Sequence, residues 1–134
     1  MITRHRVSSA ALQRYAADIE LAGRLNELLA AARQAEDVLR QAEAAGAPLA
    51  ELRELAVAFD RALTDAMRAA YAAERVQIGR RGYDDWIYRR KAKAKPTVRI
   101  WTAEAERLLT LREAHRLTGI PRLPPITERS GSAA

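Results

Sequence analysis

Apolar residues recur every three or four positions along the first 78 residues, which is the spacing of one face of an α-helix. The pattern predicts a first helix over residues 8–45. Ser8 or Ser9 would be its N-cap, because a serine oxygen accepts an otherwise unpaired N–H of the first turn. A second helix is predicted over residues 48–78. Gly46 and Pro48 separate the two, since glycine commonly follows a helix end and proline fits the first turn of the next helix.

The connection between these helices is too short for anything but antiparallel neighbours, so residues 1–78 are expected to form a long helical hairpin. At a rise of 1.5 Å per residue, each arm would be roughly 45–55 Å long. Two helices cannot cover both of their apolar stripes completely. A third helix or another subunit should therefore complete the core.

A shorter third helix is predicted over residues 102–118, with Thr102 as its cap. Gly119 followed by Ile120 and Pro121 is a typical helix stop. Residues 120–134 are rich in proline, serine and glycine, which predicts a tail without regular structure. The expected fold class is therefore all-α, in one domain: a hairpin (1–78), a connecting segment (79–101), the third helix (102–119) and the tail (120–134).

The connecting segment opens with Gly79 and Gly82, which should end or bend the second helix. Residues 82–95 could form a short helix with Asp84 or Asp85 near its start and basic residues near its end, a polarity that complements the helix dipole. Pro96 should stop that helix. Thr97–Trp101 alternates β-branched residues in the manner of an extended segment.

The composition narrows the class of protein. The 134 residues are 49% hydrophobic, mostly alanine and leucine, and 30% charged, a mixture suited to closely packed helices. The absence of cysteine excludes disulfides and thiolate metal sites. Neither a signal peptide nor a membrane span is recognisable, so a cytoplasmic location, or packaging into a virion, is expected.

Positive charge is concentrated in residues 75–101, which we call the basic segment. It holds nine Lys and Arg residues against two Asp residues, or 9 − 2 = +7. The other residues hold 14 positive and 15 negative side chains, or −1, which together give the net charge of +6. All of the excess charge therefore lies in one fifth of the chain.

Four of the seven aromatic residues interleave with these cations: Tyr83, Trp86, Tyr88 and Trp101. Cations neutralise phosphates, and aromatic faces stack on unpaired bases, so the segment is a candidate nucleic-acid surface, for DNA or RNA. The alternative is structural: the tryptophans close the end of the hairpin core and the cations are its solvated face. The candidate nucleic-acid-binding residues are Arg75, Arg80, Arg81, Tyr83, Trp86, Tyr88, Arg89, Arg90, Lys91, Lys93, Lys95 and Arg99.

The run RLLTLREAHRLTGIPRLPPITER (107–129) resembles the first helix and turn of excisionase-like and MerR-like helix-turn-helix domains. The matching residues are Leu108, Leu109, Leu111, Ala114, Leu117, Gly119 and Ile120. The resemblance covers about fifteen residues and implies a recognition helix after Gly119. Pro121, Pro124 and Pro125 fall inside that helix and would break it. A plain capped helix explains the same residues.

Catalytic and metal-binding patterns are missing. His5 and His115 lie far apart and neither belongs to a ligand-spaced set, so His115 is expected to be a partly exposed helix residue. The carboxylates of Asp84 and Asp85 would diverge on a helix. No phosphate-binding loop, nucleophile elbow or Cys–His pair occurs. We therefore expect no enzyme activity, cofactor or metal.

Three functions remain open. The first is a small basic accessory protein, as found in phages and mobile elements, that binds nucleic acid through the basic segment. The second is a structural or assembly subunit, for example of a phage particle, that uses the hairpin and the tail as protein interfaces. The third is an adaptor or inhibitor that docks on an acidic protein. A homo-oligomer or membership of a larger assembly is expected, and a membrane partner is not, because the basic segment lacks an amphipathic apolar face.

Overall fold

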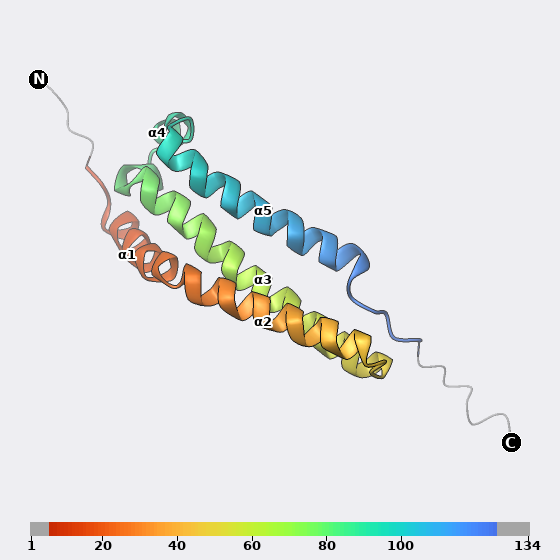
Figure 1. The fold of residues 1–134 in the computed structure, drawn as a ribbon. Helices are drawn as coiled ribbons and strands as arrows, with labels where there is room; N and C mark the ends of the chain where they lie inside the picture. The colour runs from red at the N-terminus through yellow and green to blue at the C-terminus, as the bar shows by residue number, and fades with distance from the viewer. Residues whose placement is uncertain (1–5, 126–134) are drawn as a thin grey trace, which may run out of the picture.

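A computed structural model describes residues 6–125 of the chain. This part of the protein is all-helical and contains no strand. Figure 1 shows three layers of helix side by side. The central layer is α3 (Leu49–Ile78); α1 (Ser9–Gly23) and α2 (Leu25–Ala44) follow one another along one side of it. Helix α5 (Pro96–Thr118) packs along the other side and runs in the same direction as α2.

The predicted helix over residues 8–45 is divided in two at Arg24. Ser8 caps its start as predicted, since its Oγ accepts the N–H of Ala11 at 3.1 Å. At Arg24 the backbone changes to φ −92° and ψ 0°, and its N–H bonds to Leu21 O at 3.0 Å, which tightens the last turn. Gly23 precedes this point, and glycine is a weak helix former. The prediction of one unbroken helix was therefore wrong.

Alanines on α3 let its neighbours approach closely. Ala56, Ala66, Ala69, Ala70 and Ala72 are completely buried. The larger side chains of the core lie among them and come from several helices: Leu39, Phe59, Leu63 and Leu108. The second predicted helix is confirmed as α3, and Gly46, at φ +70°, occupies the left-handed conformation in the turn before it.

Two predictions about residues 97–102 were wrong. Thr97–Trp101 is not extended, because α5 already begins at Pro96, where a missing N–H costs no helical hydrogen bond. Val98, Trp101 and Ala105 then recur at helical spacing and are buried or half-buried. Thr102 is not a cap; it lies inside α5 and its hydroxyl donates to the buried carboxylate of Glu74 on α3.

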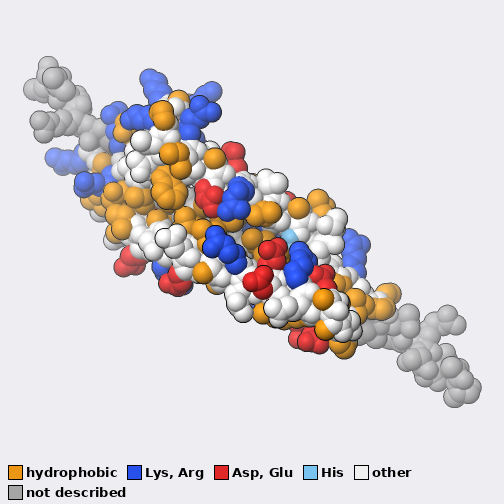
Figure 2. Space-filling view, in the orientation of Figure 1, with side chains coloured by type: hydrophobic (Ala, Val, Ile, Leu, Met, Phe, Trp, Pro, Cys, Tyr) orange, Lys and Arg blue, Asp and Glu red, His pale blue; other side chains and the backbone are white. Residues whose placement is uncertain are grey.

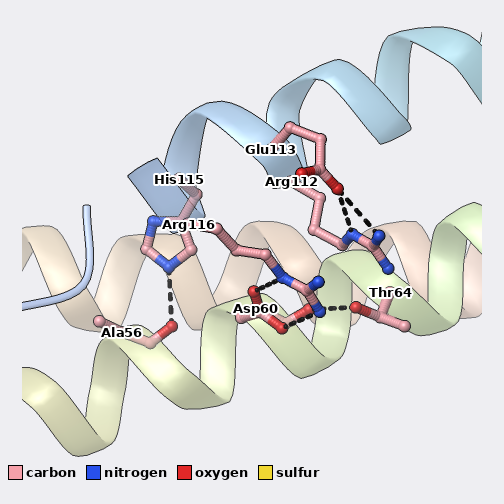
Figure 3. A network of polar contacts seen from close by, with 7 residues as sticks. All are labelled: Ala56, Asp60, Thr64, Arg112, Glu113, His115 and Arg116. Atoms are coloured by element: carbon pink, nitrogen blue, oxygen red, sulfur yellow. Dashed lines mark hydrogen bonds and ion pairs between the residues drawn. The ribbon is translucent and has the colours of Figure 1, made fainter. Parts of the chain in front are cut away.

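His115 is buried rather than partly exposed. Figure 3 shows its ring pointing from α5 to α3, where Nε2 donates to the carbonyl oxygen of Ala56 at 2.7 Å. Gly119 makes this position possible, because a Cβ there would lie only 2.3 Å from His115 Nδ1. Beside it, Arg116 Nε donates to Asp60 at 2.6 Å (Figure 3). These polar contacts fix the register between α3 and α5.

Helix α5 ends at Thr118, as predicted, and residues 120–125 are not helical. The recognition helix implied by the helix-turn-helix resemblance is therefore missing from the described part of the chain. Arg53 instead donates to the carbonyl oxygen of Pro121 at 2.8 Å and ties this segment to α3. The remaining tail prediction, for residues 126–134, lies outside the described residues, as does His5. No helix in the described part is long and apolar enough to span a membrane.

Candidate nucleic-acid interface

Short elements fold the basic segment back on itself at one end of the bundle. Helix α3 ends at Ile78, and the next residue, Gly79, has a φ of +103° that turns the chain into the 3-10 helix η1 (Arg80–Tyr83). Helix α4 (Trp86–Ala92) follows, capped by Asp85, which accepts the N–H of Tyr88 at 3.0 Å. This confirms a short helix with an aspartate at its start. Ile78, Ala92 and Val98 form a small core that holds α4 to the bundle.

Lys and Arg side chains consequently gather at this end of the molecule, around α4 (Figure 2). We call this surface the cationic end and define it by eight residues of the basic segment: Arg80, Arg81, Arg89, Arg90, Lys91, Lys93, Lys95 and Arg99. Six of the eight side chains come from only 15 residues, between Arg81 and Lys95. The turns, rather than one regular helix face, bring them together.

Arg75 and Tyr83 are turned to internal contacts. Arg75 donates from Nε and Nη2 to both oxygens of Asp18 on α1, at 2.8 and 3.1 Å, and Tyr83 OH donates to the same carboxylate at 2.6 Å. Burial raises the pKa of Asp18, but the bonds from Arg75 and Tyr83 outweigh it and the net pKa is lowered. Burial and the bond to Asp18 raise the pKa of Tyr83. This group, the Asp18 clamp, joins α1, α3 and η1.

Tyr88 forms a platform for two cations of the cationic end. The guanidinium of Arg81 lies 4.7 Å from the centre of its ring, and Lys95 Nζ lies 5.9 Å away. Arg81 also pairs with Asp85 at 3.2 Å. Arg80 lies 5.7 Å from the ring of Tyr15 on α1. These contacts hold three cations close to aromatic faces.

Four cations extend into solvent: Arg90, Lys91, Lys93 and Arg99. None forms a salt bridge with an acidic residue among residues 6–125. Trp86, the first residue of α4, is 61% exposed, and Ile87 is 52% exposed. Trp101, in contrast, packs against the bundle core. The structure thus places these four cations at the same end of the molecule as the exposed indole of Trp86, and it packs the indole of Trp101 against the core.

Arg14 also lies at this end of the molecule, although it was not among the candidate residues predicted from the sequence. It belongs to α1, yet Nη2 donates to Tyr83 O at 2.8 Å, and its guanidinium lies 5.8 Å from the Tyr83 ring. Arg89 reaches the neighbouring carbonyl, with Nη1 3.1 Å from Gly82 O. The two residues lie 75 positions apart, and no local sequence signal connects them. Only the packing of α1 against α3 does so.

A second surface feature lies between α2 and α5, which leave a groove of about 440 Å³ over α3. Phe59, Leu63 and Leu108 contribute to its apolar lining, and Arg33, Glu36, Arg40 and Arg107 are among its polar residues. Leu111 also lines it and is 45% exposed. No three His, Cys, Asp or Glu side chains in residues 6–125 gather closely enough to hold a metal ion.

No protein-family model matches the chain, and no curated protein or solved structure matches it significantly.

Proposed function

We propose that this protein binds nucleic acid through the cationic end. One observation carries the proposal: four exposed cations without carboxylate partners among the described residues lie on or next to α4, at the same end of the molecule as the exposed indole of Trp86. Phosphates would replace the missing partners, and a base could stack on the indole. Arg75 and Tyr83, which the sequence suggested as direct contacts, would support the surface through the Asp18 clamp.

The test is fluorescence anisotropy with labelled single- and double-stranded oligonucleotides over a range of salt concentrations. A variant with Arg90, Lys91, Lys93 and Arg99 changed to Ala should bind about tenfold more weakly or worse. Its plot of log affinity against log salt should be shallower by roughly 3 units, since each lost phosphate contact removes about 0.7–0.9. The absence of binding by the wild type at low salt would overturn the proposal and favour an acidic protein as the partner.

A matched control separates local charge from net charge. Changing Arg33, Arg61, Arg68 and Arg122 to Ala removes four exposed arginines that lie outside the cationic end and, like the first four, form no salt bridge within residues 6–125. Both variants go from +6 to +2 (6 − 4). The control variant should keep most of the wild-type affinity. Equal losses in the two variants would show that net charge alone, and no particular surface, attracts the nucleic acid.

Trp86→Ala tests the stacking group. Stacking of one base contributes about 1–3 kcal/mol, so single-strand affinity should fall roughly 5- to 150-fold. Double-strand affinity should change less, because paired bases do not offer their faces. Ile87→Ala is the control, since it removes exposed apolar surface of the same helix without a ring. If Trp86→Ala and Ile87→Ala behave alike, the indole does not stack.

The groove favours a second candidate function, that of an assembly subunit. The alanine face of α3 is covered, but α2 and α5 leave the groove between them open. We propose that a second copy occupies it, with α5 of each chain lying in the groove of the other. Within one chain, Arg107 pairs with Glu104 and Arg40 with Glu36. In an antiparallel pair of chains these partners would be exchanged, so that Arg107 of one copy meets Glu36 of the other and Glu104 meets Arg40. The interface would thus be self-complementary in charge as well as apolar.

Light scattering coupled to size-exclusion chromatography tests the second copy. The wild type should elute with twice the mass of one chain, and Leu111→Glu should halve it, because the carboxylate would be buried in the interface. Leu117→Glu is the control: Leu117 lies on the same helix, is 82% exposed and does not line the groove. A monomeric wild type at high concentration would refute the proposed dimer and leave the groove to a different protein.

A further inference from the structure

Three arginines from three different helices surround a small cavity at the junction of α1, α3, η1 and α4. Arg14, Arg75 and Arg89 line it together with Ile78, Gly82 and Tyr83, and no carboxylate lines it. From this arrangement we infer that the cavity is a binding site for a single phosphate group. The inference deepens the proposed function by naming one anchoring point, but it does not require that function to be correct.

The arginines are held in place before any ligand arrives. Arg14 and Arg89 each donate to one of two successive carbonyls, Tyr83 O and Gly82 O, and Arg75 is held by Asp18. A guanidinium has five N–H donors, so each of these groups retains donors after its internal bond is made. Guanidiniums fit the paired oxygens of a phosphate, and fixed donors bind at a smaller entropic cost than mobile ones.

The local charge also favours an anion. The carboxylate that is bonded into this network, Asp18, accepts hydrogen bonds from both Arg75 and Tyr83. Counting Arg14, Arg75 and Arg89 against Asp18 gives 3 − 1 = +2, about the charge that neutralises one phosphate group. Arg14 is exposed, whereas Arg75 and Arg89 are half-buried. Access is therefore expected from the Arg14 side, with the other two arginines deeper in the site.

The size of the cavity is suitable. It measures about 60 Å³, about the volume that two water molecules take up in the liquid at about 30 Å³ each. That is room for one small anion. Gly82 helps to shape this wall, because a Cβ there would lie 2.6 Å from Ile78 Cγ2 and 3.6 Å from Arg89 Cβ. A nucleoside base would be too large for the cavity, so a base would have to remain outside it.

The experiment is an NMR titration of the guanidinium N–H signals with inorganic phosphate, beside sodium chloride at equal ionic strength. Phosphate should give saturable shifts of the Arg14, Arg75 and Arg89 signals. Arg14→Ala should weaken phosphate binding at least about fivefold, and Arg61→Ala, which changes an exposed arginine outside the cavity, should not. Arg14→Lys keeps the charge and should restore only part of the binding, because lysine lacks the bidentate fork.

Shifts that do not saturate, or that chloride reproduces, would overturn the inference. Arg14 is exposed, so its variants should remain folded, and far-UV circular dichroism checks this. A second arm compares a 5′-phosphorylated oligonucleotide with inorganic phosphate as the competitor. Displacement of the oligonucleotide by phosphate would identify a nucleic-acid phosphate as the occupant, whereas independent binding would identify free phosphate. Because the first arm contains no nucleic acid, failure of the proposed function would leave its result intact.

Discussion

Arginines along the bundle and cations at the cationic end are similar residues in different surroundings. On α2, α3 and α5, several guanidiniums lie on carboxylates, for example Arg107 on Glu104 at 2.7 Å and Arg116 on Asp60 at 2.6 Å, although Arg61 and Arg68 form no such pair within residues 6–125. At the cationic end, the four outermost cations have no such partner among the described residues. The difference teaches that partner geometry and clustering, more than residue type, separate cations that a neighbouring carboxylate neutralises from cations that are available to a ligand.

The Asp18 clamp contains Arg75, which belongs to the basic segment but is paired with a carboxylate. Of the changes considered, breaking this clamp should lower the free energy of unfolding most. Asp18→Asn should lower the free energy of unfolding by about 2 kcal/mol, because Arg75 loses its ionic partner. The cost stays below that of a fully buried pair, since the side chain of Arg75 is 42% exposed. Urea unfolding followed by circular dichroism measures it. Asp37→Asn, at an exposed site on α2, should change stability by less than about 0.5 kcal/mol.

Acid should weaken the same connections. The hydrogen bond from Arg116 lowers the pKa of Asp60 more than its burial raises it, and the pKa of Asp18 is lowered as well. Because the folded state binds these protons less tightly than the unfolded state, both groups stabilise the protein above their ordinary pKa of 3.8. This stability should be lost as the pH falls below about 4 and through the lowered values. Unfolding experiments from pH 7 to pH 2 should show a shallower acid loss in Asp18→Asn than in the wild type; parallel curves would contradict the assignment.

The sequence predicted those parts of the molecule that depend on local patterns. Helical spacing of apolar residues located α3, and the glycine and serine signals located the start of α1 and the end of α5. The prediction of an extended segment at residues 97–101 was wrong, because β-branched side chains also fit a helix when a proline starts it and α3 covers one face. The prediction that His115 is partly exposed was wrong, because its burial depends on Ala56, 59 residues earlier, and on the absence of a side chain at Gly119.

The candidate site divides in the same way. Charge counting identified the cationic end correctly as a concentration of positive residues, because that property is local to the chain. It could not separate Arg75, which is paired with Asp18, from Arg90, which is exposed. It also missed Arg14, which joins the site only through the packing of α1 on α3. Pairing over such distances is set by the tertiary structure, which one sequence does not display.

Tyr83→Phe should lower the free energy of unfolding less than Asp18→Asn does, and so separates the two bonds that hold Asp18. It removes only the hydrogen bond to Asp18 and keeps the ring contact with Tyr15, whose centroid is 5.8 Å away. The expected loss is about 1 kcal/mol of unfolding free energy. Tyr71→Phe is the matched control, because the Tyr71 hydroxyl makes no hydrogen bond to residues 6–125. Equal stability of the two variants would mean that Arg75 alone holds Asp18.

The smallest stability effect is expected where the effect on binding is largest. Changing Arg90, Lys91, Lys93 and Arg99 to Ala removes exposed charges that pair with no carboxylate in the described region, so no hydrogen bond or ion pair is lost. Two small effects on the free energy of unfolding oppose each other. Alanine has the higher helix propensity, whereas cations near the C-terminus of α4 stabilise it by interacting with the helix dipole. The free energy of unfolding should therefore stay within about 0.5 kcal/mol of the wild type in urea. Unchanged stability would assign any loss of nucleic-acid binding to the surface itself. A loss of about 2 kcal/mol or more would show instead that these cations also hold the bundle together, and the division between paired and available cations would fail.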